Sequence, residues 1–146
     1  MGGLNKKYFV TELKGDLPVA PWDPQFAQNE ATKLLRLDDD VIKGAFYLEC
    51  AWFWPGKWPE NKPWEKMGVK PHAHEYPEVL TFFGSDPDSP YDLCGQVELW
   101  IDGEKYLIEQ SVIVFIPPGT NHCPLYIRRV DRPIFHFSSG LGKNYF

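Results

Sequence analysis

Apolar residues in this chain gather in short runs that alternate with polar residues and are separated by turns. Fourteen prolines and twelve glycines interrupt the sequence so often that long helices have little room. Val, Ile, Phe, Tyr and Trp, which favour strands, fill the runs between them. This pattern predicts an all-β fold. The segments that we expect to form strands are residues 45–54, 78–84, 97–101, 104–108, 111–117, 125–130 and 133–138.

Three other segments carry local signals. Asp102-Gly103 separates two of the expected strands and predicts a type I′ hairpin turn, because both central residues of that turn need a positive φ. Residues 25–37 fit either a short helix or a lead into the first strand. Residues 84–95 form an acidic loop with two prolines, which is either a lid over a site or, more simply, an ordinary surface excursion.

The number and spacing of these strands indicate a sandwich or barrel rather than an α/β fold. A chain of 146 residues fits one domain with one core. We expect residues 41–146 to form a single β-barrel domain. Residues 1–40 would then be an N-terminal extension, an arm or short helix that packs on the domain or is exchanged with a partner.

Composition limits the classes of function. The net charge of −5 offers no positive footprint for nucleic acid or an anionic membrane, and no run approaches the roughly 18 apolar residues of a membrane span. Cys50, Cys94 and Cys123 contain no Cys-x-x-Cys pair, which disfavours a disulfide framework and a structural zinc site. We therefore expect a cytoplasmic protein that binds a small molecule and forms a homodimer.

The segment KPHAHEYPE, residues 70–78, contains two of the four histidines. If it is the end of a strand that continues into residues 78–84, His72, His74 and Glu78 share parity and face one side, the interior. Each buried polar group without a partner would cost about 2 kcal/mol or more. A divalent metal removes this penalty, because it binds neutral imidazole and ionised carboxylate.

A second segment, FIPPGTNHCP, supplies another possible ligand. Pro117 and Pro118 end an expected strand, and Gly119 permits a tight turn. His122 follows where the next strand begins. A turn of this kind could bring His122 back toward the first group of ligands.

Together, these two segments make the chain resemble the cupin superfamily of small β-barrels. His72-x-His74-x-x-x-Glu78 is similar to the centre of the first cupin motif, and Pro117-x-Gly119-x-x-His122 to the centre of the second. The resemblance covers about residues 66–138. Departures fall at the motif edges and remove no ligand: the chain has Lys66, Ser85 and Ser111 where the motifs have glycine, and Tyr126 where the second has asparagine.

The resemblance implies a cupin-type jelly roll, or six-stranded double-stranded β-helix barrel, around one mononuclear metal. The ligands would be His72, His74, Glu78 and His122. Iron(II) and manganese(II) are the family's commonest metals for this set, with nickel, cobalt, copper and zinc possible. Two positions of an octahedron would stay open for substrate, which suits a dioxygenase-type oxidoreductase. A metal-dependent lyase or isomerase and a non-catalytic small-molecule-binding cupin are the alternatives.

Further residues are candidates for the site. His136 shares a face with Ile134 and Ser138, which would look into a cupin's pocket, so it is a candidate acid/base group beside Glu78; the alternative is a hydrogen-bonded core histidine. Residues 49–64 hold four of the six tryptophans, which favours dimer packing, with Trp52 or Trp54 at the pocket entrance. Tyr126 and Arg128 are candidate substrate contacts, although exposed charges that answer Asp131 explain this arginine-rich segment more simply.

Overall fold

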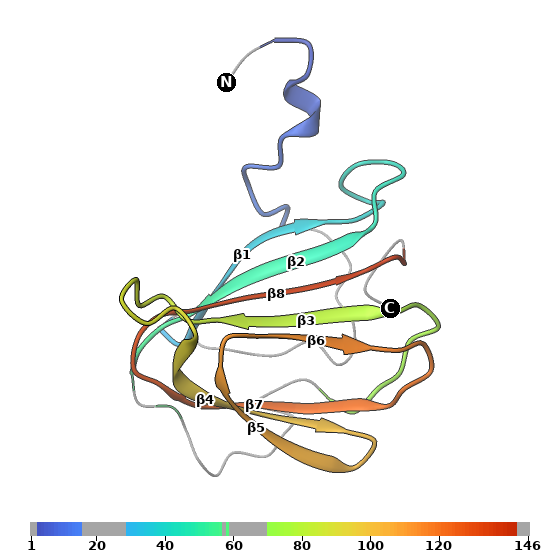
Figure 1. The fold of residues 1–146 in the computed structure, drawn as a ribbon. Helices are drawn as coiled ribbons and strands as arrows, with labels where there is room; N and C mark the ends of the chain where they lie inside the picture. The colour runs from blue at the N-terminus through green and yellow to red at the C-terminus, as the bar shows by residue number, and fades with distance from the viewer. Residues whose placement is uncertain (1–2, 16–28, 57, 59–69, 143–146) are drawn as a thin grey trace.

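The computed structural model describes residues 3–15, 29–56, 58 and 70–142 (Figure 1). These residues form one short 3-10 helix, η1 (Lys6–Tyr8), and eight strands. The strands are β1 (Ala31–Leu37), β2 (Tyr47–Phe53), β3 (Glu78–Phe83), β4 (Asp92–Ile101), β5 (Glu104–Gln110), β6 (Val112–Ile116), β7 (His122–Val130) and β8 (Ile134–Gly140). The predicted all-β class is confirmed.

The strands form two antiparallel sheets that pack around one core (Figure 1). The larger sheet has the order β1-β2-β8-β3-β6 and the smaller one β5-β4-β7. Side chains from the two sheets meet between them, among them Phe53, Leu80, Phe82, Ile116 and Ile134 from the larger sheet and Leu93, Val97, Leu99, Leu125 and Ile127 from the smaller. This is a jelly-roll arrangement of eight described strands, the seven that the sequence predicts and β1.

Most strand positions follow the alternation of the sequence. Each of the seven segments expected to be strands contains a strand, with ends displaced by a few residues. The β4–β5 hairpin turns at Asp102 and Gly103, whose φ values are 49° and 78°. The predicted turn with two positive φ angles is therefore confirmed.

The short-helix interpretation of residues 25–37 is wrong where it can be examined. Residues 31–37 are β1, which pairs antiparallel with β2 through a register shift between Lys33 and Leu35. Hydrogen bonding to β2 thus outweighs the helix propensity of the Ala, Leu, Lys and Arg side chains. Residues 25–28 lie outside the described part, and the boundary at residue 40 stays a prediction, although β1 on its N-terminal side is part of the larger sheet.

The predicted loop at residues 84–95 is shorter than expected, since β4 begins at Asp92. The loop follows Phe83, whereas Glu78 is at the other end of β3. This topology favours the surface excursion over a lid. Ser111, which replaces a motif glycine, stabilises the turn: its hydroxyl accepts a hydrogen bond from the Gly84 amide at 2.9 Å and donates one to the Pro90 carbonyl at 2.7 Å.

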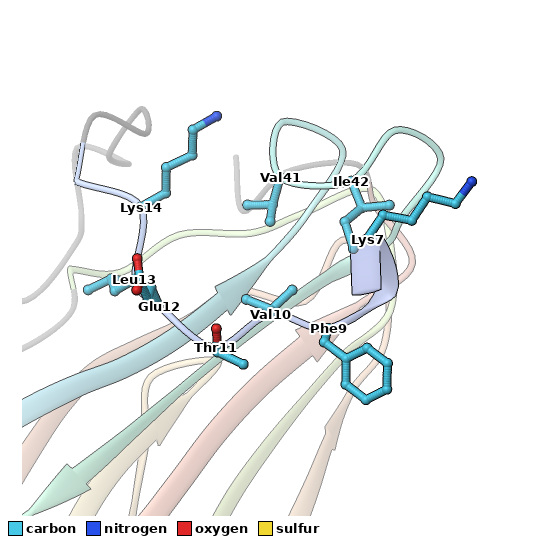
Figure 2. Close-up of a pocket in the computed structure, with 9 residues that line it drawn as sticks. All are labelled: Lys7, Phe9, Val10, Thr11, Glu12, Leu13, Lys14, Val41 and Ile42. Atoms are coloured by element: carbon cyan, nitrogen blue, oxygen red, sulfur yellow. The ribbon is translucent and has the colours of Figure 1, made fainter. Parts of the chain in front are cut away.

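The N-terminal arm, residues 3–15, runs beside the turn between β1 and β2. Figure 2 shows Val10 facing Val41 and Ile42 across a shallow pocket of about 300 Å³. η1 contributes no buried residue. Among the described residues there is no helix with the length and hydropathy that a membrane crossing requires.

Candidate metal centre

Four potential metal ligands from separate parts of the chain meet at one end of the two sheets. His72, His74, Glu78 and His122 each offer one ligand atom, and these atoms all lie within 4.8 Å of one another. Glu78 and His122 are 1% and 0% exposed, and the other two histidines are 8% exposed. The cluster is therefore assembled inside the protein, where the solvent cannot hydrate its polar atoms.

Backbone hydrogen bonds hold the two motifs against each other. The amide of His72 donates to the carbonyl of His122 at 3.0 Å, and the amide of His122 donates back to His72 at 2.9 Å. Gly119, with a φ of 76°, donates its amide to the His74 carbonyl at 2.7 Å. The predicted turn after Pro118 thus brings His122 to the first motif.

The backbone conformation of the first motif differs from the continuous strand that we expected from the sequence. Residues 70–77 do not continue β3; within them, His72 forms an isolated antiparallel bridge to His122. Strand parity therefore does not align His72 and His74 with Glu78. The bridge to His122 and the bend before Glu78 bring the three side chains together instead.

Two of the histidine rings are oriented by their Nδ1 atoms. Nδ1 of His72 lies 2.5 Å from the Lys70 carbonyl, and Nδ1 of His122 lies 2.9 Å from the Thr120 carbonyl. A carbonyl oxygen only accepts, so each Nδ1 carries the proton and each neutral ring keeps its Nε2 lone pair. The Nε2 atom of a ring held in this way is ready to bind a cation.

The protonation states suit a cation as well. Burial lowers the pKa of His72 from 6.5 to about 4, and the rings of His122 and His74 act in the same direction. Burial raises the pKa of Glu78, but hydrogen bonds and charge from His122 and His74 outweigh it and hold the pKa at about 2. At neutral pH His72 is therefore a neutral imidazole and Glu78 an ionised carboxylate, the forms that bind a metal.

The distances also fit one ion. Ligand atoms bound at about 2.1 Å from a common metal lie roughly 3 to 4 Å apart. Here Nε2 of His74 is 2.9 Å from Oε2 of Glu78, and Nε2 of His122 is 3.8 Å from Oε1 of the same carboxylate. Three nitrogen donors and one carboxylate suit a divalent transition metal. The donor set and spacing thus agree with the metal site that the sequence predicts.

His136 does not belong to the cluster. Its ring stacks between Phe53 and Phe82, at centroid distances of 5.5 and 4.7 Å, and its Nδ1 donates to the Thr81 carbonyl at 2.7 Å. Burial lowers the pKa of His136 to about 4. Its partner Phe82 is four residues along β3 from Glu78, about 13 Å at the usual rise. These contacts favour the hydrogen-bonded core histidine, and an acid/base role stays a prediction.

The two candidate tryptophans lie away from the cluster. Trp52 pairs with Phe135 across β2 and β8, on the face opposite to Phe53 and the core. Trp54 stacks on Trp52 at 5.7 Å and donates its Nε1 hydrogen to Thr32. Their place on the outer face does not support an entrance role. Trp58 contributes to the core, and Trp64 lies outside the described residues.

Tyr126 and Arg128 also lie outside the core. Both belong to β7, where Tyr126 is opposite Glu98 and the intervening residue Ile127 faces the core. The guanidinium of Arg128 pairs with Glu98 at 3.2 Å and lies 4.3 Å from the centre of the Tyr126 ring. An ion pair with the buried carboxylate of Glu98, on the face of β7 turned away from the core, therefore occupies Arg128, whereas Asp131 pairs with Arg129.

Two tyrosines near the cluster were not singled out from the sequence. Tyr76 stacks on the His74 ring at 4.7 Å. Tyr47 begins β2 opposite Gly140, which is also opposite Glu78, so all three lie in one row across the larger sheet. The position of Tyr76 between two ligands was an available signal. Tyr47 could be placed only by knowing the strand pairing.

Comparisons with known proteins identify the fold. No family model and no curated protein matches the sequence. A recombinant oxalate oxidase in complex with glycolate matches 94% of this chain and 61% of its own, with 14% identity and a TM-score of 0.50. This chain thus spans less than two thirds of that protein.

Two further solved structures are similar over most of the chain. A cupin protein from Bacteroides fragilis matches over 84% of each chain, with 18% identity and a TM-score of 0.43. KdgF from Halomonas sp. matches 75% of this chain and 76% of its own, with 17% identity and a TM-score of 0.40. The chain shares its fold with the oxalate oxidase, and its three histidines and one glutamate meet where the two cupin-like segments of the sequence come together.

Proposed function

We propose that this protein is a mononuclear metal-dependent enzyme that acts on a small organic molecule, with oxidative chemistry of the dioxygenase type. The observation that carries the proposal is the buried convergence of His72, His74, Glu78 and His122. Four protein ligands leave an octahedral ion two further positions, and such open positions distinguish catalytic from structural metal sites. Iron(II) and manganese(II) are the metals we propose first.

The bound ion would supply Lewis acidity toward a substrate oxygen and a redox centre for oxygen chemistry. The protein's own groups prepare the site for it. Glu78 holds one negative charge, and an imidazole that binds a metal does so in its neutral form, so a divalent ion held by this set would leave a net positive centre. A positive centre in a buried site favours a substrate that presents an anionic or easily ionised oxygen.

The side chains beside the cluster support a polar substrate. The Tyr47 hydroxyl is buried, lies 2.9 Å from Ser138 Oγ and donates to Glu49 at 3.2 Å. Burial raises the pKa of Tyr47, so this phenol stays protonated. A polar wall on the same end of the sheet as Glu78 is suited to a small oxygen-rich molecule. We propose that class of substrate.

The same electrophilic site would also suit a lyase or isomerase, in which a carboxylate or imidazole moves a proton. A small-molecule-binding cupin without turnover is the second alternative. We keep oxidative chemistry first because the resemblance to cupins with this ligand set favours it.

Oxygen consumption separates the three possibilities. The protein is purified without oxygen, loaded with iron(II) or manganese(II), and given catechols, diketones and hydroxy acids. Oxygen uptake that depends on one substrate class supports the dioxygenase. Turnover without uptake would replace it with a lyase or isomerase, and tight binding without turnover would indicate a binding protein. His122→Ala, with the same handling, is the control for uptake by free metal.

A further inference from the structure

We propose that Tyr76 is a positioning residue for the metal ligand His74, and that Gly140 and Gly142 are glycines because its ring occupies the space of their side chains. The inference rests on the proposed metal site. It adds a determinant of metal affinity that lies outside the four ligands.

The first observation is the contact between the two rings. The Tyr76 ring lies 4.7 Å from the His74 ring with an angle of 15° between their planes. Parallel stacking at this distance restricts rotation of the imidazole about its bond to the backbone. His72 and His122 have carbonyl partners at Nδ1 that orient them. The aromatic face of Tyr76 adds a restraint of its own on the His74 ring.

The second observation is the pair of glycines on the two edges of the tyrosine ring. A Cβ on Gly140 would lie 2.6 Å from Cδ2 of Tyr76 and 3.1 Å from the Pro77 carbonyl oxygen. A Cβ on Gly142 would meet the tyrosine ring alone, at 2.6 Å from Cδ1 and 2.7 Å from Cε1. Separations under 3.0 Å force a shift. Neither glycine has a positive φ, in contrast to Gly119 and Gly103. Their lack of a side chain is therefore required by the ring rather than by the backbone conformation.

The third observation is that these glycines belong to the sheet end that carries Glu78. Gly140 is opposite Glu78 on one side of β8 and opposite Tyr47 on the other. The Tyr47 amide donates to the Gly142 carbonyl at 3.0 Å, which extends the pairing beyond β8. Tyr76 thus packs residues 70–77, which are not in a strand and include His74, against the hydrogen-bonded end of β8. The position of His74 is tied to Glu78 through this contact.

The test is the affinity of the full chain for Co²⁺ alone, with the visible spectrum of the bound ion as a report of its coordination. Tyr76→Phe keeps the ring and should bind within about twofold of wild type. Tyr76→Leu keeps apolar bulk without a flat face and should bind about tenfold or more weakly, as is usual when a group that orients a ligand is lost, with an altered spectrum. Tyr91→Leu, at a tyrosine that is 82% exposed, is the matched control and should change neither.

A double-mutant cycle makes the test independent of general destabilisation. Gly142→Ala, whose Cβ would meet the Tyr76 ring alone, should weaken Co²⁺ binding in wild type by displacing the ring, but should have little further effect in Tyr76→Leu, where no ring is present. Equal effects of Gly142→Ala in both backgrounds, or a wild-type affinity and spectrum in Tyr76→Leu, would overturn the inference while leaving the metal site intact. Failure of wild type itself to bind Co²⁺ would overturn the proposed function and this inference with it.

Discussion

Hydrogen bonds at Nδ1 determine which ring atom His72, His122 and His136 offer. For His72 and His122 the bonded Nδ1 leaves Nε2 directed at Glu78 and the other ligands. For His136 the bonded Nδ1 is at Thr81, and the ring is enclosed by two phenylalanines. The same residue type therefore has two roles in this protein, and the neighbours of each ring separate them.

Substitution should distinguish these roles. We expect His122→Ala to abolish most metal occupancy, because it removes one of four ligands. His136→Ala should leave metal occupancy unchanged, because His136 is outside the cluster, and should alter activity if the ring assists catalysis. Elemental analysis of the purified variants measures the occupancy. Equal metal loss in both variants would show that His136 is a ligand.

The metal-free protein should lose stability as the pH falls from about 6.5 to about 4. His136 and His72 have folded pKa values of about 4, below the ordinary value of 6.5, so the folded state binds protons less readily than the unfolded state. The stability that this confers is complete above 6.5 and is lost toward pH 4, at up to about 1.4 kcal/mol per pH unit for each group. The lowered pKa of Glu78 causes a further loss of stability at lower pH, between about pH 4.5 and pH 2.

Denaturant unfolding at several pH values, with a chelator present, measures this dependence. His136→Gln removes one of the titrating groups and should reduce the slope between pH 6.5 and 4. A slope identical to that of wild type would contradict the assignment of a lowered pKa to His136.

At the scale of elements, the turn at Gly119 is as important as the strands for holding the metal ligands together. Gly119 and Gly103 have φ values of 76° and 78°, and a Cβ at either position would meet nothing within 4 Å. Alanine at either site should therefore cost about 1 kcal/mol of backbone strain. Only the Gly119 turn donates a hydrogen bond to a ligand residue, through its amide to His74.

Gly119→Ala and Gly103→Ala form a matched pair. Both should lower the free energy of unfolding by similar amounts, and only Gly119→Ala should weaken metal binding. Unfolding curves and metal titration on the two proteins check this. If both variants bind metal equally well, the Gly119 turn does not position His122 and His74 as we describe.

The secondary-structure elements that the sequence predicted correctly are those whose local conformational preferences agree with their tertiary contacts. Alternating β-branched and aromatic residues marked the strands, and Asp102-Gly103 marked its hairpin, because turn chemistry is local. Residues 31–37 were left open between a helix and a lead into the first strand, because their side chains favour a helix and only pairing with β2 makes them a strand. The four metal ligands could be predicted because the site requires their types and spacing. The roles of Trp52 and Arg128 at a pocket stay predictions; both side chains lie on faces turned away from the core, and distance along the chain does not reveal which face a side chain occupies.

At the scale of the whole molecule, the outer face of the larger sheet carries exposed apolar residues at its edge. Ile113 and Phe115 on β6 are 66% and 61% exposed and alternate with residues that face the core. Contiguous exposed apolar surface often marks a contact with another protein. The homodimer stays a prediction; the sequence favours dimer packing by the tryptophans of residues 49–64, and this edge of the sheet is a second candidate contact.

Sedimentation of the purified chain tests the predicted dimer. We expect a dimer at micromolar concentration, and Phe115→Lys should shift it toward monomer by placing a charge in the contact. Leu107→Lys, at a residue 53% exposed on the edge of the smaller sheet, should leave the dimer unchanged. A monomeric wild type, or equal dissociation in both variants, would contradict an interface on β6.

Anomalous X-ray diffraction from metal-loaded crystals tests the central claim most directly. The structure predicts one anomalous peak, within bonding distance of an Nε2 atom from each of His72, His74 and His122 and of a carboxylate oxygen of Glu78. A peak bound by other residues, or no peak in crystals grown with excess manganese(II), would contradict a metal centre at this position.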